Sequence, residues 1–316
     1  MFFFKKISLH RSTTASNCAD VCCMENKIKG TKLTSSADIR SISLRGKRFS
    51  FEKPCAMGII NVNSDSFYSG SRVNEQTIFE FAQKHVNEGA VFLDLGASTS
   101  KPGSPISDAE DEWKRLKPAL EIVRNAFPEI YISIDTYHSS VARKAVEIGA
   151  ELINDISAGS IDSKMFDTIA ELQVPYVLMH MQGIPETMQQ NPNYANVTKE
   201  VIEHFMRHVH VLESKGVVDI IIDPGFGFGK TLDQNYELFH DLEAFSIFEK
   251  PLLIGISRKS MITRLFECNA DEALNGSTVL HTIALQNGAS ILRVHDVKPA
   301  MEAIRIVNKL KDVQSH

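Results

Sequence analysis

Polar side chains that can bind a ligand end each of eight short apolar runs along the chain. The runs read AMGIIN, VFLDL, YISID, ELIND, YVLMH, DIIID, LLIGIS and ILRVH. The polar residues at their ends are Asn61, Asp94, Asp135, Asn154, Asp155, His180, Asp223, Ser257, Arg293 and His295. Carboxylates, amides, imidazoles and a guanidinium together supply both hydrogen-bond donors and acceptors. Their recurrence at the same place after each run predicts one shared site.

The first chemistry that these residues suggest is recognition of a flat polar ring. Asp135, Asn154 and Asp223 supply two carboxylates and an amide, and Lys259 lies two positions after the end of the seventh run. A carboxylate can accept hydrogen bonds from an amino group and a neighbouring ring N–H, and an amide can pair with one donor and one acceptor. This set favours a heterocycle, with Asp135, Asp223 and Lys259 as the candidate catalytic residues.

A second group of residues favours an anion and a divalent metal. Arg293 and His295 end the eighth run, and Asn61 ends the first run, which neighbours the eighth in a closed barrel. Arginine offers a planar fork of donors that fits phosphate oxygens, and an amide oxygen is a suitable ligand for Mg²⁺. The expected ligand therefore carries a phosphate or pyrophosphate beside its ring, and Asn61 is the candidate metal ligand.

Stretches with helical spacing separate the eight runs, so the expected order is strand, helix, strand, helix throughout. This order predicts an α/β fold, a (β/α)8 TIM barrel formed by a single domain over residues 37–316. The carboxyl ends of all the barrel strands open on one face, where active sites lie in such barrels. A hairpin within SISLRGKRFSF is expected to cover the opposite end.

Each polar strand end also has a purely structural explanation when it is taken alone. Asn154 or Asp155 could cap the next turn, Asp94 could bond to neighbouring strand backbone, and His180 could be a satisfied interior histidine. Eight such ends in one register favour a common mouth over eight separate structural roles. Within that mouth, Asp94, Asp155, His180 and Ser257 are expected to support the ligand-binding residues rather than contact the ligand.

Two long loops, NSDSFYSGSR and GASTSKPGSPIS, follow the first and second expected strands. Connections in barrels are usually short, and long loops rich in Ser and Gly at the mouth are typical of lids. We expect both loops to close over a ligand that must be kept from water.

The composition limits the classes of function. The chain has 316 residues, 43% of them hydrophobic, so it can bury a large core. Its net charge of −5 and its lack of a Lys and Arg cluster argue against a nucleic-acid partner. No run approaches the roughly 20 apolar residues that a membrane span needs. Cys55 and Cys268 are isolated thiols, which favours a reducing compartment and a cytoplasmic location.

The first 36 residues differ in character from the remainder. They contain Ser and Thr clusters, few acidic residues and no sustained period, so a disordered, flexible extension is expected. Cys18, Cys22 and Cys23 lack the further Cys or His at the spacing of a zinc finger. The apolar FFF is too short for a signal peptide and precedes its lysines. Met24 is an alternative start, which mass spectrometry of the native protein would test.

The segment GFGFGKT resembles a phosphate-binding loop but departs from that pattern. Pro224 stands where the Walker pattern requires its first glycine, and the segment comes late in a barrel instead of after a first strand. Gly225, Gly227 and Gly229 more plausibly let backbone approach a flat ligand, with Phe226 or Phe228 supplying a ring against it.

Taken together, the motifs GIINVNSDSF, LINDISAG, MHMQGIPETMQ, DPGFGFGKT, GISRKSMI and RVHDVKP resemble those of the dihydropteroate synthases, a family of pterin-binding enzymes. The resemblance covers about residues 55–307 in the same order. It implies a transferase that joins 6-hydroxymethyl-7,8-dihydropterin pyrophosphate to 4-aminobenzoate, forming dihydropteroate and pyrophosphate. It also implies a homodimer and a target of sulfonamides.

The resemblance assigns the candidate residues to three subsites. Asp135, Asn154, Asp223 and Lys259 match the family's pterin contacts. Asn61, Arg293 and His295 match its Mg²⁺ and pyrophosphate positions. The remaining matches, to the aminobenzoate pocket, are Ser100, Lys101, Pro102, Phe228 and Ser260. The implied reaction is dissociative: the pyrophosphate departs, Asp135 stabilises the resulting pterin cation by its charge, and the amine attacks it.

The chain departs from the family pattern in both expected lids. Asn63-Ser64 replaces the usual Thr-Pro, Ser98 replaces Glu, and Ser100-Lys101 replaces Thr-Arg. Lysine lacks the fork of arginine, so contact with pyrophosphate is expected to differ in geometry. These changes put the rate and the sulfonamide affinity in question.

Two other functions remain open from the sequence. A methyltetrahydrofolate-dependent methyltransferase of the same superfamily would share the pterin contacts, but SRKS and RVHD together are not expected in one. A non-catalytic paralogue would bind pterin without turnover because of its altered loops. Assays for dihydropteroate formation and for methyl transfer separate the three possibilities.

Overall fold

The structure is a computed structural model that describes residues 40–62, 72–98 and 103–314, within a compact unit spanning Ile39–His316. The expected extension over residues 1–36 lies outside the described residues, as do residues 63–71 and 99–102 of the two expected lids. The strands of the main sheet are β3 (Cys55–Asn61), β4 (Phe92–Gly96), β5 (Tyr131–Asp135), β6 (Leu152–Asp155), β7 (Tyr176–Met179), β8 (Ile220–Asp223), β9 (Leu253–Ile254) and β10 (Ile291–Val294).

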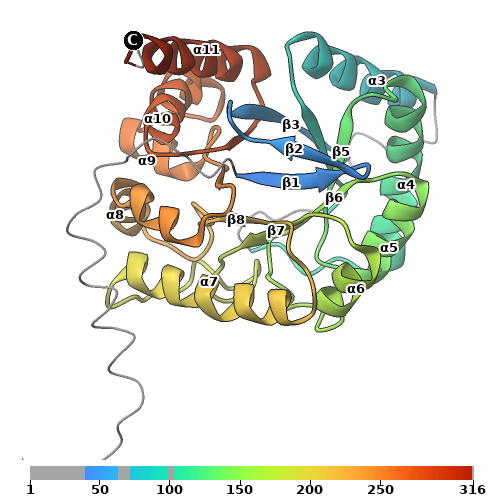
Figure 1. Ribbon diagram of the computed structural model, residues 1–316, viewed down its shortest axis with the longest axis horizontal. Coiled ribbons are helices and arrows are strands. Elements are labelled where there is room, and N and C mark those ends of the chain that lie inside the picture. The colour runs from blue at the N-terminus through green and yellow to red at the C-terminus, as the bar shows by residue number, and fades with distance from the viewer. Residues whose placement is uncertain (1–39, 63–71, 99–102, 315–316) are drawn as a thin grey trace, which may run out of the picture. The chain divides into compact units, whose positions relative to one another are not determined.

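These eight strands form a parallel ring in the order β8-β7-β6-β5-β4-β3-β10-β9. A parallel bridge between Ile222 and Leu252 joins the two ends of the order and closes the ring. Helices surround the strands on all sides (Figure 1). The predicted (β/α)8 barrel is therefore confirmed.

The helices follow the strands in alternation, as expected. They are α3 (Arg72–Asn87), α4 (Ala109–Ala126), α5 (Ser139–Ile148), α6 (Met165–Leu172), α7 (Val197–Ser214), α8 (Leu232–His240), α9 (Ser260–Phe266), α10 (Leu274–Gln286) and α11 (Val297–Gln314), with 3₁₀ turns η1 (Leu242–Phe248) and η2 (Asp271–Ala273). Asp108 caps α4 by accepting hydrogen bonds from the backbone N–H groups of Glu110 and Asp111. Thr231 and Gln234 form a capping box that begins α8 at the end of the GFGFGKT segment.

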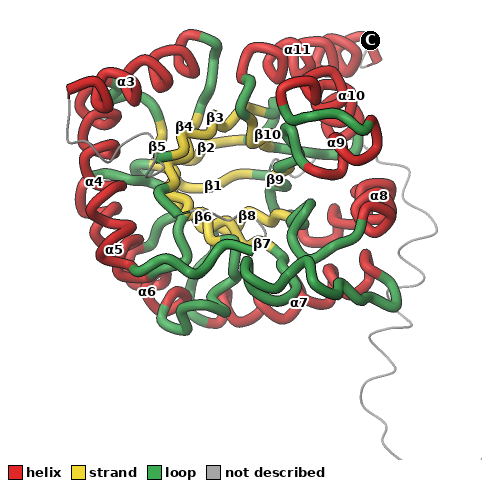
Figure 2. Tube along the Cα trace, turned by 180° about the vertical axis from the view of Figure 1, so that it is seen from behind, coloured by secondary structure: helices red, strands yellow, loops and turns green. Residues whose placement is uncertain are grey.

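A short antiparallel hairpin covers one end of the barrel. It consists of β1 (Ser41–Leu44) and β2 (Lys47–Ser50), and its turn places Arg45 and Gly46 at positive φ. Ile42, Leu44 and Phe51 are buried against the amino-terminal halves of the barrel strands. In Figure 2 the hairpin lies across the ring of strands. It seals the end where the strands begin, so the opposite end is the open mouth.

Two apolar layers account for the nearly continuous Val, Ile and Leu of the strands. One layer lies between the strands and the surrounding helices, and the second fills the barrel interior beneath the hairpin. Parallel strands are buried on both faces, so both layers draw on the same short runs. Among the described residues, no helix is long and apolar enough to cross a membrane.

Candidate active site

The side chains that point into the barrel change from apolar to polar toward the mouth. Residues two apart on a strand share a face, so Phe92 is followed inside the barrel by Asp94, and Leu152 by Asn154. The corresponding pairs on β5, β8 and β10 are Ser133 and Asp135, Ile221 and Asp223, and Ile291 and Arg293. Strand pairing places Asp135 beside Asn154. The polar strand ends predicted from the sequence therefore meet in one layer.

Arg293 lies at the centre of this layer between two carboxylates. Its Nε donates to Asp94 Oδ2 and its Nη2 to Asp135 Oδ2, each at 2.6 Å. Burial acts to lower the pKa of Arg293, but Asp94 and Asp135 outweigh it and raise the pKa above its usual value. The guanidinium is thus a permanent cation whose orientation is fixed by carboxylates on two other strands, β4 and β5.

Asp94 has a larger supporting role than its sequence position suggested. Its side chain is fully buried, and besides Arg293 it accepts hydrogen bonds from Ser133 Oγ at 2.5 Å and Asn154 Nδ2 at 3.0 Å. One carboxylate therefore orients both the cation and the amide of the layer. Because Asn154 donates its N–H to Asp94, its carbonyl oxygen is turned toward other partners.

Asp135 carries a strongly perturbed carboxylate. Burial raises its pKa to about 7, with the nearby charge of Asp94 acting in the same direction and Arg293 opposing both. A carboxylate held between ionised and neutral forms at neutral pH is typical of a functional site. Its position at the end of β5, beside Arg293 and Asn154, makes it the strongest candidate for charge stabilisation during a reaction.

Asp223 and Lys259 face the same space from neighbouring strand ends. A Cβ added at Gly255 would lie 3.7 Å from Lys259 Nζ and 3.9 Å from Asp223 Oδ2, so only glycine leaves this space open. Burial lowers the pKa of Lys259 to about 8 and raises that of Asp223, while the attraction between them opposes both shifts. Asp223 Oδ1 also accepts the Gly225 N–H at 2.8 Å.

Lys259 is held against the glycine-rich segment that follows β8. Its Nζ donates to Phe226 O at 2.7 Å and lies 4.6 Å from the centre of the Phe228 ring. A cation over an aromatic face is attracted by the ring quadrupole, so the two side chains stabilise each other's position. Phe228 is thereby placed at the mouth beside Lys259, as the sequence predicted for a ring that walls a flat ligand.

His295 and Asn61 lie at the rim of the mouth, where both are exposed. The ring Nδ1 and the backbone N–H of His295 lie 3.1 Å and 3.2 Å from Ser257 Oγ. Partial burial of the His295 ring lowers its pKa, and the nearby charge of Arg293 acts in the same direction. Both effects favour the neutral ring. Asn61 ends β3, next to Gly96 of β4 in the strand register.

The other predicted residues divide into two groups. Ser260 is exposed at the first position of α9, directly after Lys259. Ser100, Lys101 and Pro102 lie outside the described residues, so the structure does not test them. At the border of that gap, Ser98 Oγ contacts both Ser107 Oγ and Glu112 Oε2, which anchors the described ends of the second loop.

The predicted supporting residues bond to protein groups beneath the mouth. Asp155 is fully buried and accepts hydrogen bonds from the N–H and hydroxyl of Ser157, from the Gly159 N–H and from the Tyr176 hydroxyl. His180 Nδ1 lies 3.0 Å from Lys230 Nζ, and Ser257 holds His295. The contacts of Asp155 and His180 are with other protein groups, whereas Ser257 holds a residue at the rim of the mouth.

The lysine of GFGFGKT does not serve a phosphate-binding loop. Lys230 is 2% exposed, and its Nζ donates to the carbonyl oxygens of Gly225 at 2.8 Å and Phe228 at 3.1 Å. A P-loop lysine reaches a phosphate instead of its own loop carbonyls. The sequence argument against that motif therefore has a geometric basis.

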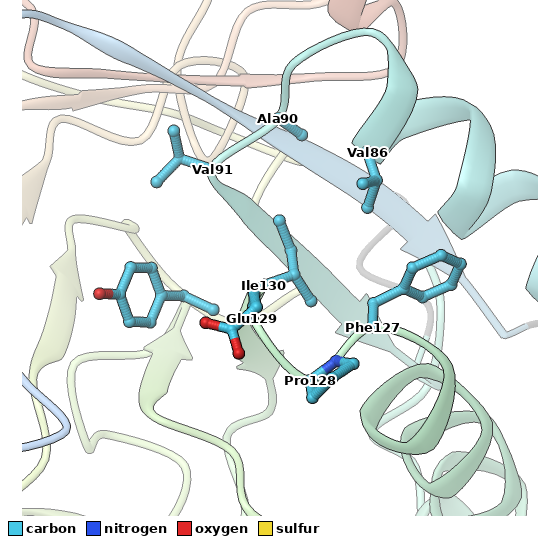
Figure 3. Close-up of a pocket in the computed structure, with 8 residues that line it drawn as sticks. Val86, Ala90, Val91, Phe127, Pro128, Glu129 and Ile130 are labelled. Carbon is cyan, nitrogen blue, oxygen red and sulfur yellow. The ribbon is translucent and has the colours of Figure 1, made fainter.

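A groove at the opposite end of the barrel is not part of this site. It has a volume of about 410 Å³ and lies where β4 and β5 begin (Figure 3). Its lining residues are Val86, Ala90, Val91, Phe127, Pro128, Glu129, Ile130 and Tyr131. This lining is mainly apolar and lacks the convergent polar groups that mark a catalytic pocket.

The described residues fit a magnesium ion that a substrate brings with it better than a dedicated metal cage. No group of three or more His, Cys, Asp or Glu side chains in the described part of the chain is arranged to hold a metal. Mg²⁺ is commonly bound through one or two protein oxygens together with substrate phosphates. The exposed amide of Asn61 beside the Arg293 end of the mouth suits such an arrangement.

Comparison with known proteins gives concordant matches over the barrel. A family model described as pterin binding enzyme matches residues 57–295. The dihydropteroate synthase of Escherichia coli is 40% identical over 266 residues, which cover 83% of this chain and 94% of that protein. The Haemophilus influenzae enzyme of the same name is 37% identical over 80% of this chain and 92% of its own.

Solved structures show the same likeness. The Yersinia pestis dihydropteroate synthase in a sulfonamide drug complex superposes with a TM-score of 0.81 at 34% identity, covering 86% of this chain and 99% of that one. The Xanthomonas albilineans dihydropteroate synthase with 4-aminobenzoic acid gives a TM-score of 0.80 at 32% identity, covering 86% and 98%.

Proposed function

The chain belongs to the pterin binding enzyme family, and on this premise we propose that it catalyses the dihydropteroate synthase reaction. In this reaction (7,8-dihydropterin-6-yl)methyl diphosphate condenses with 4-aminobenzoate to give 7,8-dihydropteroate and diphosphate, a step of tetrahydrofolate biosynthesis. The observation that carries the proposal is the set of Asp135, Asn154, Asp223 and Lys259 in the mouth, with the Arg293 guanidinium bonded to Asp135. Such a mouth offers acceptors to a ring and a cation to an adjoining diphosphate.

The pterin is assigned to the carboxylate and amide side of the mouth. Asp223 offers carboxylate oxygens to the amino and ring N–H groups, and Asn154 offers its carbonyl oxygen because its N–H is used by Asp94. Lys259 donates to the ring acceptors from above the Phe228 face. A ligand that leaves one of these buried polar groups without a hydrogen bond loses about 1–3 kcal/mol of binding free energy. The site therefore selects for a ring with the donors and acceptors of pterin.

The diphosphate is assigned to Arg293, His295 and Asn61. Arg293 contributes a fixed positive charge, and His295 contributes a neutral imidazole at the rim. When bound, Mg²⁺ would be held by the Asn61 amide and the diphosphate oxygens, and it would neutralise charge on the leaving group. The amount of positive charge needed from the protein is smaller for that reason.

The reaction proceeds by dissociation at the methylene carbon. The carbon–oxygen bond breaks, and its electron pair leaves on the diphosphate beside Arg293. The ionised Asp135 stabilises the pterinylmethyl cation, since it faces the same layer from β5. The 4-aminobenzoate nitrogen then forms the new carbon–nitrogen bond and releases a proton.

The aminobenzoate is assigned to Phe228 and Ser260 at the mouth, and the family resemblance adds Ser100, Lys101 and Pro102, which lie outside the described residues. Phe228 supplies a flat ring directly beside Lys259. This arrangement sets the amine between the ring wall and the pterin methylene.

A direct assay tests the proposal. The purified protein is supplied with the pterin diphosphate, Mg²⁺ and 4-aminobenzoate, and dihydropteroate is measured by chromatography. We expect product from the native chain and a loss of at least about 100-fold in kcat/KM for Lys259→Ala and Asp223→Asn. Wild-type turnover in both variants would overturn the site, and methyl transfer from methyltetrahydrofolate without dihydropteroate would overturn the reaction.

We further propose that the protein acts as a cytoplasmic homodimer. Exposed apolar side chains lie at helical spacing on two adjacent helices, with Val279 and Ile283 on α10 and Ile306, Leu310 and Val313 on α11. A patch of this kind favours burial against a second copy. The two cysteines in the described residues, Cys55 and Cys268, are both free thiols, which suits a reducing compartment.

A further inference from the structure

Lys230 is a buried charged group to which the proposed reaction gives no role. Its Nζ lies within hydrogen-bond distance of three acceptors: Gly225 O at 2.8 Å, His180 Nδ1 at 3.0 Å and Phe228 O at 3.1 Å. An ammonium has three N–H donors, so this set uses all of them. The lysine thereby ties both ends of the segment Gly225–Phe228 to the end of β7.

The same segment faces the active site with its other side. Phe226 O accepts the hydrogen bond from Lys259, and the Phe228 ring lies beneath the Lys259 cation. Gly225 N–H donates to Asp223. The segment therefore lies between two lysines: Lys259 contacts it from the mouth, and Lys230 holds it from the protein interior.

The backbone of this segment requires an external hold. Gly225, Gly227 and Gly229 all have positive φ, and glycine gives a chain little conformational preference of its own. A Cβ at Gly225 would lie 1.9 Å from His180 O, so the segment packs directly on the strand that carries Lys230's third partner. Lys230 restrains the two ends of the segment, and Asn235 and Gln189 bond to Gly227 in its middle.

We propose that Lys230 is a positioning residue for the aminobenzoate subsite, which holds the Gly225–Phe228 segment so that the Phe228 ring and the Phe226 carbonyl keep their places beside Lys259. The inference rests on the proposed function for the identity of the ligand. Lys230 does not contact substrate. It acts through Phe228, so its loss weakens 4-aminobenzoate binding more than pterin binding, for which Asp135 and Asn154 are held by contacts outside this segment.

The charge of Lys230 is adjustable near neutral pH. Burial lowers its pKa to about 7, and Asp223 opposes this shift. A neutral amine has one N–H donor fewer, so one of the three contacts is lost on deprotonation. The charged or titratable groups that face this lysine are His180 just after β7, His204 of α7 with His208 beside it, Asp223 of β8 and Lys259 before α9.

The test compares the full-length wild type with Lys230→Met and Lys230→Gln. Methionine keeps most of the volume without a donor, whereas glutamine restores two N–H donors. Lys250→Met is the control, because Lys250 is a partly buried lysine that is also bonded to a carbonyl, Val218 O, but lies away from the mouth. KM for 4-aminobenzoate is measured at saturating pterin diphosphate, and the affinity for 6-hydroxymethylpterin is measured by calorimetry.

For Lys230→Met we expect KM for 4-aminobenzoate to rise about tenfold, with pterin affinity changed by less than about threefold. The KM of Lys230→Gln should lie between those of Lys230→Met and the wild type, and the KM of Lys250→Met should match that of the wild type. A merely structural role would instead reduce the fraction of active enzyme, lowering kcat and leaving KM unchanged. That result, or an unchanged KM in both variants, overturns the proposal. If the methionine variant does not fold, the glutamine variant carries the same comparison.

The pH dependence provides a second readout. KM of the wild type should rise as pH increases through about 7, because Lys230 loses its proton, whereas Lys230→Met should lack that rise and retain only the one due to Lys259 near pH 8. The aminobenzoate itself does not titrate in this range. Identical KM profiles for both proteins would contradict the proposal. Absence of dihydropteroate from the wild type would contradict the proposed function instead, so the two failures are distinguishable.

Discussion

A single carboxylate, Asp94, orients the two most important polar groups of the mouth, which leads to the first prediction. Asp94→Asn leaves the Arg293 cation with only Asp135 as its partner. Breaking a buried ion pair of this kind costs about 3 kcal/mol of unfolding free energy. Urea denaturation should show that loss, together with a large fall in kcat/KM.

The matched control for Asp94→Asn is Ser133→Ala. It removes only the hydroxyl that donates to Asp94 and leaves the carboxylate in place. A hydrogen bond from a hydroxyl to a charged carboxylate contributes about 1.5 kcal/mol at the low end, so the control should lose about half as much stability as Asp94→Asn and should retain turnover. Equal denaturation midpoints for the aspartate variant and the wild type would contradict the role of the ion pair.

The second prediction at the scale of residues concerns the pH dependence of the rate. Burial raises the pKa of Asp135 to about 7, so this side chain is mainly protonated below that pH. Only its ionised form stabilises a pterin cation, so kcat should fall about tenfold per pH unit below about 7 and level off above it. Asp135→Asn should have a low kcat without this acidic limb. A wild-type kcat that is constant from pH about 5 to about 8 would exclude this role.

Residue identities could be predicted from the sequence, but their partners could not. Asn61, Asp135, Asn154, Asp223 and Arg293 follow apolar runs, and that local pattern is enough to place them at strand ends. The contact between Arg293 of β10 and Asp94 of β4 reaches across the intervening strand β3 and joins residues 199 positions apart. Such a contact depends on side-chain reach after the ring has closed, which no local pattern encodes.

At the scale of elements, two neighbouring segments at the mouth are joined by an ion pair. Arg258, just after β9, donates from Nε and Nη2 to the two carboxylate oxygens of Asp296, just after β10, at 2.7 Å and 3.0 Å. Arg258 has a φ of +55°, which is unfavourable for a residue with a Cβ. The bidentate pair therefore restrains the backbone on which Lys259 and His295 are mounted.

The third prediction follows from the charge of this pair. Hydrogen bonding to Arg258 lowers the pKa of Asp296 below its usual value. A lowered carboxylate pKa contributes stability above the unfolded-state pKa of about 4, and this contribution is lost as pH falls through the folded-state value. Asp296→Asn should therefore cost about 1 kcal/mol at neutral pH and nearly nothing in acid. Urea denaturation at several pH values measures both; a cost that is independent of pH would contradict the assignment.

Helices and strands were predicted well where the hydrophobic periodicity was strong. The prediction was incomplete where tertiary contacts decide where an element ends. The run LLIGIS gave the seventh strand correctly, yet β9 keeps only Leu253 and Ile254 in the sheet. The segment beyond it leaves the strand direction early, and Lys259 becomes the residue that precedes α9. The lid residues 99–102 lie outside the described residues, so their predicted contacts remain predictions.

At the scale of the whole molecule, the fold was predictable because one local pattern is repeated. Each strand-and-helix unit has the same pattern of buried and exposed residues, so a wrong prediction for one unit does not change the predicted barrel. The hairpin that covers one end of the barrel was predictable for a similar reason. Its alternating residues Ile42 and Leu44 require an apolar surface, and the lower barrel interior provides it. A surface that binds a second copy of the chain is not encoded by a repeated pattern of this kind.

The last prediction concerns the dimer surface that we propose on α11. Ile306, Leu310 and Val313 of α11 are 59%, 51% and 61% exposed, and they share one side of the helix at spacings of four and three residues. Burying an isoleucine side chain contributes about 1.5–3 kcal/mol, and a charge at its centre reverses that gain in both copies of a symmetric interface. Ile306→Glu should therefore convert a dimer into a monomer in analytical ultracentrifugation while the pterin affinity is kept. Val218→Glu is the control, because Val218 is 67% exposed but lies before β8. A dimer that persists in Ile306→Glu would place the interface elsewhere.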